Sequence, residues 1–205
     1  MKKIALSLGT LVAISSLGFA GGDIAPVEPE VMAPVVMDSN DKGVYVGLGM
    51  SAVSARDSSL DMDFTSSEIG QDRLANVTFL LGYNLNEYFA VEGRYTTTFS
   101  NEDLVELDGL SVFVKPQYPL SEDFSVYALL GYGSVQMDGV GSAKGRVDVD
   151  DSGFQWGLGA SYAFGDNYTI FVDYTSLASE MDGIYYNGAR QADADALTLG
   201  LTYKF

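Results

Sequence analysis

Five charged residues lie in strand-like segments of this sequence, and their side chains offer its most obvious chemistry: Glu92, Arg94, Lys115, Asp173 and Lys204. Each occupies the more polar of the two alternating positions of its segment, so the carboxylates and the cations should project to the same side. Charges that leave water must pair, because an unpaired buried charge is expensive. A paired cluster of this kind either lines an ion path or gate, or forms a structural polar plug, and we favour the plug.

The residue types that the chain lacks exclude most enzymatic chemistry. Its 205 residues include no Cys and no His, so it can form neither a disulfide nor a thiolate metal site, and it lacks the commonest general base. We therefore expect no enzyme activity, no catalytic residue, no metal site and no cofactor. The formal net charge of -17 argues against nucleic acid as a partner, because phosphates require Lys and Arg.

One acidic run, from Asp148 to Gly153, begins with the spacing of a calcium-binding loop. The bidentate Glu expected at the twelfth position of such a loop is replaced by Gly159. We therefore interpret this run as a solvated acidic loop.

Strands are the elements that must position these side chains. In the last ten residues one alternating set is apolar throughout, and it comprises Leu197, Leu199, Leu201, Tyr203 and Phe205. A strict period of two with one apolar face predicts a β-strand. A soluble protein would have to bury this row inside itself, whereas a membrane barrel would point it at lipid.

The same alternation predicts eight strands, at 44–52, 74–83, 89–97, 110–118, 124–134, 154–164, 168–177 and 196–205. Short turns follow the second, fourth and sixth strands. Long polar segments follow the first, third, fifth and seventh, at 56–73, 98–109, 135–152 and 178–195. This order predicts an all-β fold, an eight-stranded antiparallel up-and-down transmembrane β-barrel with periplasmic turns and outer loops. Pro116 must lie near a strand end or a bulge, because Pro cannot donate to a ladder.

Three further patterns favour a membrane over a water-soluble barrel of the lipocalin type, which alternation alone leaves open. Aromatic residues gather near both ends of the predicted strands, as membrane interfaces favour; Tyr83 and Tyr168 lie near short turns, and Tyr132 and Trp156 near long segments. The less apolar strand faces are rich in Gly and Ser, which suit a narrow lumen. The apolar faces carry no charge along the strand centres.

The N-terminal residues differ in composition from the predicted barrel at 43–205. Residues 1–20 have a lysine pair, an apolar core and a small-residue cleavage site at Gly18-Phe19-Ala20, which predicts a cleaved signal peptide and export. Residues 21–42 are rich in Pro and acidic side chains, which predicts an extended periplasmic linker. A partner for this linker is an open alternative to a plain spacer.

The segment Tyr88-Phe89-Ala90-Val91-Glu92-Gly93-Arg94-Tyr95 and the closing Leu201-Thr202-Tyr203-Lys204-Phe205 resemble the OmpA/OmpX-like outer-membrane β-barrel superfamily. A terminal aromatic is that family's assembly signal, so the resemblance gives this role to Tyr203 and Phe205 and implies recognition by the outer-membrane barrel assembly machinery. It also implies contact with outer-membrane lipid and lipopolysaccharide. Outer-membrane enzymes resemble one another in needing a His, which is absent. Full-length OmpA continues into a peptidoglycan-binding domain, and none is expected here.

We expect a small, monomeric, integral outer-membrane barrel with a structural or surface-interaction role and a lumen filled by polar and charged side chains. Two alternatives stay open: a narrow porin-like channel for small solutes, and an adhesin that acts through its acidic outer loops. Glu92 and Lys115 lie at comparable distances from the connection at 98–109, which predicts that they are cross-strand neighbours.

Overall fold

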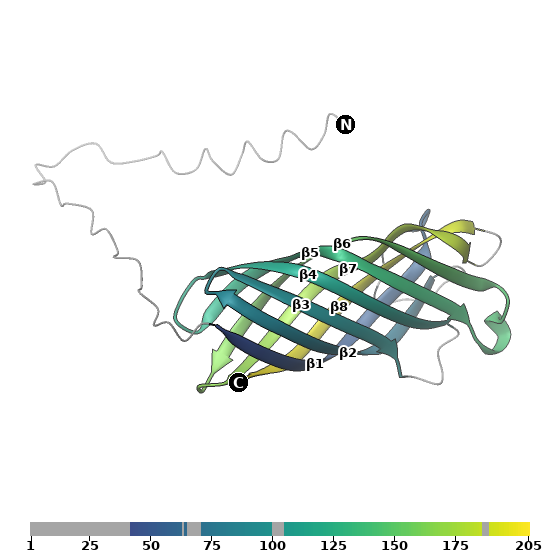
Figure 1. Ribbon diagram of the computed structural model, residues 1–205. Helices are drawn as coiled ribbons and strands as arrows, with labels where there is room; N and C mark the ends of the chain where they lie inside the picture. The colour runs from purple at the N-terminus through teal and green to yellow at the C-terminus, as the bar shows by residue number, and fades with distance from the viewer. Residues whose placement is uncertain (1–41, 63, 65–70, 100–104, 186–188) are drawn as a thin grey trace, which may run out of the picture. The chain divides into compact units, whose positions relative to one another are not determined.

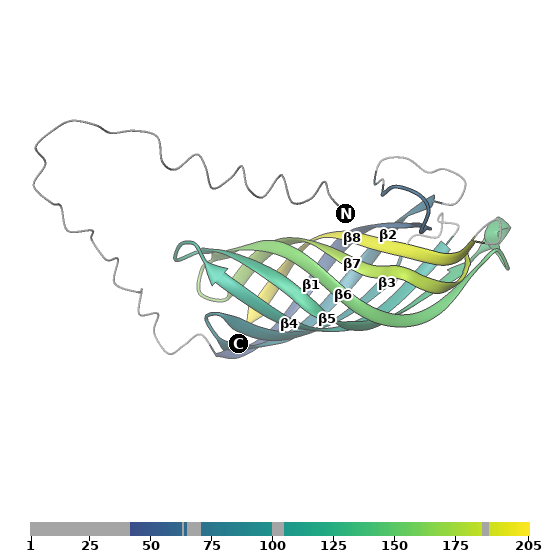
Figure 2. The ribbon, with the colours of Figure 1, turned by 90° about the horizontal axis from the view of Figure 1, so that it is seen from above.

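The computed structural model describes residues 42–62, 64, 71–99, 105–185 and 189–205. Strands make up nearly all of this part of the chain: β1 (Gly43–Asp57), β2 (Gln71–Asn86), β3 (Phe89–Thr98), β4 (Val105–Pro119), β5 (Phe124–Gly139), β6 (Val147–Phe164), β7 (Tyr168–Tyr185) and β8 (Ala189–Lys204). Consecutive strands pair antiparallel, and β8 pairs with β1 (Figures 1 and 2). The predicted eight-stranded antiparallel barrel is therefore confirmed. The signal peptide predicted at 1–20 and nearly all of the linker predicted at 21–42 lie outside the described residues.

The two ends of the barrel differ in their connections. The short β2–β3, β4–β5 and β6–β7 turns gather at one end, here called the turn end, where the C-terminus also lies (Figure 1). The β6–β7 turn needs Gly165, because its φ of 65° is a left-handed conformation that glycine adopts without strain. At the opposite end, called the loop end, a short 3-10 turn, η2 (Gly141–Ala143), connects β5 and β6. No helix in the described part of the chain has the length and apolar composition of a membrane span.

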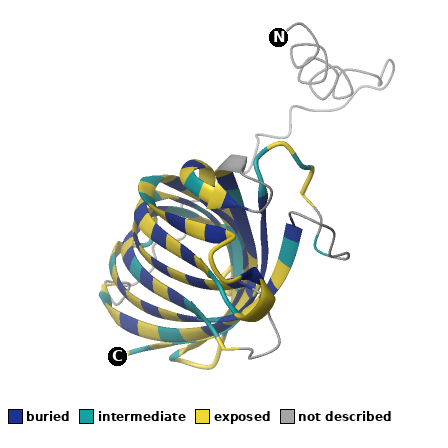
Figure 3. Cartoon of the chain, turned by 90° about the vertical axis from the view of Figure 1, so that its right-hand side faces the viewer, coloured by how far each residue is buried: buried dark blue, intermediate teal, exposed yellow. Residues whose placement is uncertain are grey.

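The middle of the barrel presents apolar side chains outward. On β8, Leu197, Leu199 and Leu201 are exposed while Thr198 between them is buried, and Figure 3 shows this alternation along the strands. Exposed aromatic side chains lie on both sides of this aliphatic band: Tyr83, Tyr88, Phe89, Tyr118, Phe124, Tyr162, Phe164, Tyr168, Tyr203 and Phe205 toward the turn end, and Tyr95, Phe99, Tyr132, Phe154 and Trp156 toward the loop end. An apolar band between two aromatic girdles is the pattern of a barrel whose surroundings are lipid.

The predicted loops at 98–109, 135–152 and 178–195 were too long, because the strands continue well beyond their predicted ends, whereas the strands enter the predicted loop at 56–73 by only a few residues. Most of 135–152, for example, is strand, and the run interpreted as an acidic loop from Asp148 belongs to β6. Toward the loop end the polarity of the two faces reverses. On β4, Leu107 is buried and Glu106 is exposed, whereas Leu110 farther along the strand faces outward. Water surrounds this part of the barrel in place of lipid, so the apolar row must turn inward.

The reversed faces give the loop end an apolar core inside the barrel. It is built from buried side chains of β1, β2, β4, β5, β6, β7 and β8 with Ala143 of η2: Val53, Ala55, Leu74, Val105, Leu107, Val135, Met137, Val147, Val149, Leu177, Ala178, Met181, Tyr185, Ala192, Ala194 and Ala196. Tyr185 donates a hydrogen bond of 2.7 Å to the Ala55 carbonyl, so its hydroxyl is satisfied within this core. The loop end is therefore packed in the manner of a water-soluble barrel.

Two of the interruptions in the ladders involve side chains that explain them. Pro116 lies where the β4–β5 pairing skips from Val114 to Gln117, opposite the first residue of β3, in agreement with its predicted place near a strand end or bulge. Pairing between β6 and β7 stops between Val149 and Trp156. There the Gln155 side chain donates a 2.7 Å hydrogen bond to the Leu177 carbonyl, so a side chain replaces the missing backbone partner.

Candidate functional site: a charged cluster inside the barrel

Four charged side chains meet in the interior of the barrel, and they come from three strands. Glu92 and Arg94 lie two residues apart on β3, Lys115 lies on β4, and Asp173 lies on β7 across the lumen. The Arg94 guanidinium donates to Glu92 at 2.6 Å and to both carboxylate oxygens of Asp173 at 2.7 and 3.0 Å. Lys115 donates to the second oxygen of Glu92 at 3.2 Å. Two anions and two cations make the cluster formally neutral, which offsets much of the cost of burying them.

The cluster is buried as well as paired. The exposed fraction is 0% for Glu92, 1% for Asp173, 4% for Arg94 and 9% for Lys115. Fork-shaped, two-bond pairing of an arginine with a carboxylate is among the strong hydrogen-bonded geometries in proteins. The Arg94–Asp173 pair ties β3 to the opposite wall of the barrel, so the cluster is also a cross-link across the lumen.

Two tyrosines complete the hydrogen bonding of the carboxylates. Tyr45 of β1 donates to Glu92 at 2.5 Å, and Tyr127 of β5 donates to Asp173 at 2.7 Å. Lys115 Nζ also lies 4.1 Å from the centre of the Tyr127 ring, a distance typical of cation–π contact. Each carboxylate therefore has a cation and a hydroxyl as partners, and its charge is met from several strands.

Glycines make room for these two rings. A Cβ at Gly82 would collide with the Tyr45 ring, and a Cβ at Gly159 would lie 2.5 Å from the Tyr127 ring. Both glycines face the ring from a neighbouring strand, so the absence of a side chain lets each tyrosine lie flat against the wall. Tyr45 and Tyr127 were not predicted from the sequence as site residues. The available signal was that Tyr45 shares its inward face with Gly47 and Gly49, so a large polar aromatic stands among small residues there.

The structure places the five predicted site residues in two groups. Glu92, Arg94, Lys115 and Asp173 form the cluster, whereas Lys204 lies outside it at the turn end. The predicted contact between Glu92 and Lys115 is present, but the two are diagonal neighbours. Lys115 stands directly opposite Ala90 in the β3–β4 register, and its long side chain reaches across to Glu92.

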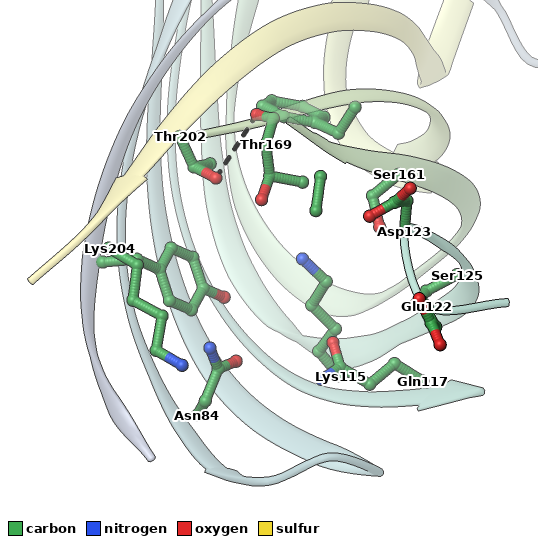
Figure 4. A pocket seen from close by; sticks show the side chains of 13 residues that line it. Asn84, Lys115, Gln117, Glu122, Asp123, Ser125, Ser161, Thr169, Thr202 and Lys204 are labelled. Atoms are coloured by element: carbon green, nitrogen blue, oxygen red, sulfur yellow. Dashed lines mark hydrogen bonds between the residues drawn. The ribbon is translucent and has the colours of Figure 1, made fainter. Parts of the chain in front are cut away.

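A polar hollow of about 160 Å³ opens at the turn end below the cluster (Figure 4). Lys115 projects into it from β4, and Lys204, Asn84 and Gln117 line its wall, with Glu122 and Asp123 of the β4–β5 turn at its edge. Because Lys115 also binds Glu92, the inner limit of the hollow is the charged cluster itself. Water or a small solute that enters from the turn end therefore meets the cluster first.

A row of hydroxyl groups lies on the loop side of the cluster. Ser51 bonds Thr198 and Thr78 at 2.8 Å each, and Thr78 bonds Thr96 at 2.9 Å. All four side chains are buried, so β8, β1, β2 and β3 are joined inside the lumen by hydroxyl contacts. Within the described residues no group of three or more acidic side chains has an arrangement that could hold a metal ion.

A closed antiparallel barrel with an outward apolar band, two aromatic girdles and a polar interior is the architecture of integral outer-membrane proteins. The protein is of that class; in such barrels the short turns face the periplasm and the longer loops face the outside of the cell. The outer membrane protein beta-barrel domain family matches residues 30–205, and the chain belongs to this family.

Two relatives are named outer membrane protein A. The protein of Buchnera aphidicola subsp. Schizaphis graminum is 31% identical over 107 residues, which cover 46% of this chain and 30% of the relative. The protein of Yersinia pseudotuberculosis is 28% identical over an alignment of 220 residues, which covers 100% of this chain and 56% of the relative. The chain thus spans about half or less of the length of these relatives.

Solved structures share the fold. Ail of Yersinia pestis, in complex with the heparin analogue sucrose octasulfate, has a TM-score of 0.55 and 18% identity, covering 80% of this chain and 99% of that one. Neisserial surface protein A has a TM-score of 0.50 and 19% identity, covering 80% of this chain and 97% of that one. At this identity the likeness shows the fold alone.

Proposed function

We propose that the protein is a structural outer-membrane barrel whose lumen is closed to solutes by its own side chains. The observation that carries the proposal is the neutral, buried cluster around Arg94, which ties β3 to β7 across the interior. An eight-stranded barrel encloses an interior just wide enough for side chains, so a cross-link of this kind occupies the space that a solute would need.

Two further layers support the closure. The row of hydroxyl groups at Ser51, Thr78, Thr96 and Thr198 lies next to the cluster, and the apolar core of the loop end fills the outer part of the barrel. An ion that left water would have to break the cluster and then cross the apolar core. The cost of placing a charge among apolar groups opposes that path.

Single-channel recording tests this proposal. The refolded mature protein in a planar bilayer should show no steady open current, and the Glu92→Gln/Lys115→Met double variant should show a higher conductance. Lys204→Met is the matched control, because it removes a cation at the turn end outside the cluster. Large, steady currents from the wild type would refute closure and establish the narrow channel in its place.

The acidic outer surface favours a second role, in contact with a cationic partner. Glu106, Asp138 and Asp148 stand directly opposite one another on β4, β5 and β6, and all three are exposed near the loop end. Like charges in this arrangement reduce stability. The surface would repel a polysulfate such as the heparin analogue bound by Ail. A bead coated with polylysine should bind the protein at low salt. Loss of this binding in high salt and in the Asp138→Asn/Asp148→Asn double variant would support the role. Binding that is unchanged by salt and by the double variant would refute it.

A further inference from the structure

The polar hollow at the turn end is lined by neutral donors and acceptors as well as by charges. Its volume of about 160 Å³ leaves room for several water molecules, each of which takes about 30 Å³, and therefore for a small organic solute. Hydroxyl and amide side chains face it from strands all around the barrel: Asn84, Gln117, Ser125, Ser161, Thr169 and Thr202. A polar solute in the hollow can therefore form hydrogen bonds on several sides.

Charges of opposite sign lie on opposite sides of this hollow. In Figure 4, Lys204 stands on one side, and Glu122 and Asp123 stand on the other. Lys115 projects into the space between them. The barrel fixes this separation, because β8 and β4 are four strands apart in either direction around the closed sheet. Ala163 donates a backbone hydrogen bond of 2.8 Å to the Asp123 carbonyl, which holds the acidic β4–β5 turn against β6.

Lys115 and the acidic turn can bind a solute without giving up their present contacts. The Lys115 ammonium has three N–H donors, and it uses one of them on Glu92 at 3.2 Å. Glu122 and Asp123 are exposed, and within the described residues neither side-chain carboxylate has a hydrogen-bond or ion-pair partner. The lysine therefore offers donors to an anionic group, and the turn offers acceptors to a cationic group.

This arrangement favours a molecule that carries both charges. Glu122 and Asp123 at the edge repel a simple anion, and Lys115 at the floor repels a simple cation. A zwitterion can turn its carboxylate toward the lysine and its ammonium toward the turn, so that both interactions are attractive. These attractions are stronger than in bulk water, because the wall of the barrel partly excludes water from the hollow.

We propose that the hollow is a binding site for a small zwitterion of the amino-acid class. Its carboxylate accepts a hydrogen bond from Lys115, and its ammonium binds Glu122 and Asp123. The charged cluster forms the floor of the site, so the ligand enters and leaves by the turn end. The site goes beyond the proposed closure of the lumen and does not depend on it, because the ligand lies between the cluster and the turn end.

Probes that share one four-carbon chain test this selection on the refolded protein in detergent micelles. 4-Aminobutanoate carries both charges, butanoate carries only the carboxylate, and butylammonium carries only the ammonium. Ligand-observed NMR titration should show that 4-aminobutanoate binds about tenfold more tightly than either of the others, the gain expected from one further hydrogen bond between charged groups. Equal binding by all the probes, or no binding of 4-aminobutanoate, would overturn the proposal. Binding in micelles is measured without any current, so this result and the conductance result can fail separately.

Variants assign the two ends of the ligand. Glu122→Gln/Asp123→Asn should weaken 4-aminobutanoate about tenfold and should strengthen butanoate, because the repulsion at the edge is removed. Asp166→Asn is the matched control and should bind every probe as the wild type does, because Asp166 is an exposed carboxylate of the β6–β7 turn that does not line the hollow. Lys115→Gln should shift the preference toward butylammonium, with the heat-dependent gel shift as the check on folding. Unchanged affinities in Glu122→Gln/Asp123→Asn, or an equal loss in Asp166→Asn, would refute the site.

Discussion

The charged cluster gives the sharpest test of the folding argument, because its members have unequal numbers of partners. Glu92 accepts hydrogen bonds from Tyr45, Arg94 and Lys115, and it is completely buried. Lys115 is 9% exposed, and its contact with Glu92 is the longest of the three, at 3.2 Å. Removal of the carboxylate charge should therefore cost more than removal of the ammonium.

Breaking a buried pair by removing one partner costs about 3–5 kcal/mol. We expect Glu92→Gln to lower the free energy of unfolding by about 3 kcal/mol, the low end of this range, since Gln preserves the shape and some hydrogen bonds. Lys115→Met should cost about 1–2 kcal/mol, because Glu92 retains Arg94 and Tyr45 as partners. The double variant should cost about 1 kcal/mol less than the sum, as directly interacting residues do.

Urea unfolding of the refolded barrel in lipid vesicles measures these differences. Trp156 is the single tryptophan, and it faces lipid with 41% of its surface exposed, so its fluorescence reports loss of the membrane-embedded barrel. Lys144→Met serves as the control, because Lys144 is exposed at the connection between β5 and β6, and it should change stability by no more than about 0.5 kcal/mol, the usual effect of a surface substitution. Strict additivity of the two variants, or an equal cost for both, would refute the assignment of partners.

Four other outcomes are expected. The mature chain should fractionate with the outer membrane and run faster on a gel unheated than boiled; recovery as a soluble periplasmic protein would contradict the fold assignment. Deletion of Phe205 should slow or prevent insertion and leave protein in the periplasm, whereas a normal membrane yield would remove the assembly role of this residue. Gly159→Ala should destabilise the barrel by about 1–3 kcal/mol by crowding the Tyr127 ring, measured against Gly93→Ala, where a Cβ meets nothing closer than 3.8 Å. Leu107→Ala should cost about 2–5 kcal/mol if the loop end has a packed core; a near-zero change would show that it does not.

The sequence by itself determined the membrane-embedded part of the protein. Alternation such as that of Leu197, Leu199 and Leu201 specifies a strand and marks the face that meets lipid, because lipid selects one kind of side chain along the whole row. The placement of Glu92, Arg94 and Asp173 on the inward parity followed from the same rule. The prediction of the strand and the prediction of the inward charges depend only on residues close together in the chain and on lipid as the one medium outside this part of the barrel.

The length of the strands was decided at the tertiary level. On β4 the outward row is Leu110 within the lipid-facing band and Glu106 beyond it, so the same geometric face changes polarity along one strand. A search for continuous apolar alternation stops at that change and assigns a loop. The strand continues because closure of the barrel creates an interior that Leu107 can fill, although water has replaced lipid outside.

The partners within the cluster were also decided by closure of the barrel. Arg94 and Asp173 are 79 residues apart in the chain, and Tyr45 and Glu92 are 47 apart. The alternation along each strand shows that these side chains point inward. It does not specify which side chains of opposite strands lie at the same position along the barrel axis. That choice depends on the stagger of all eight strands around the closed sheet, a property that no single strand carries. The sequence therefore supplied the inward charges, and the closed barrel decided which of them meet and left Lys204 at the rim.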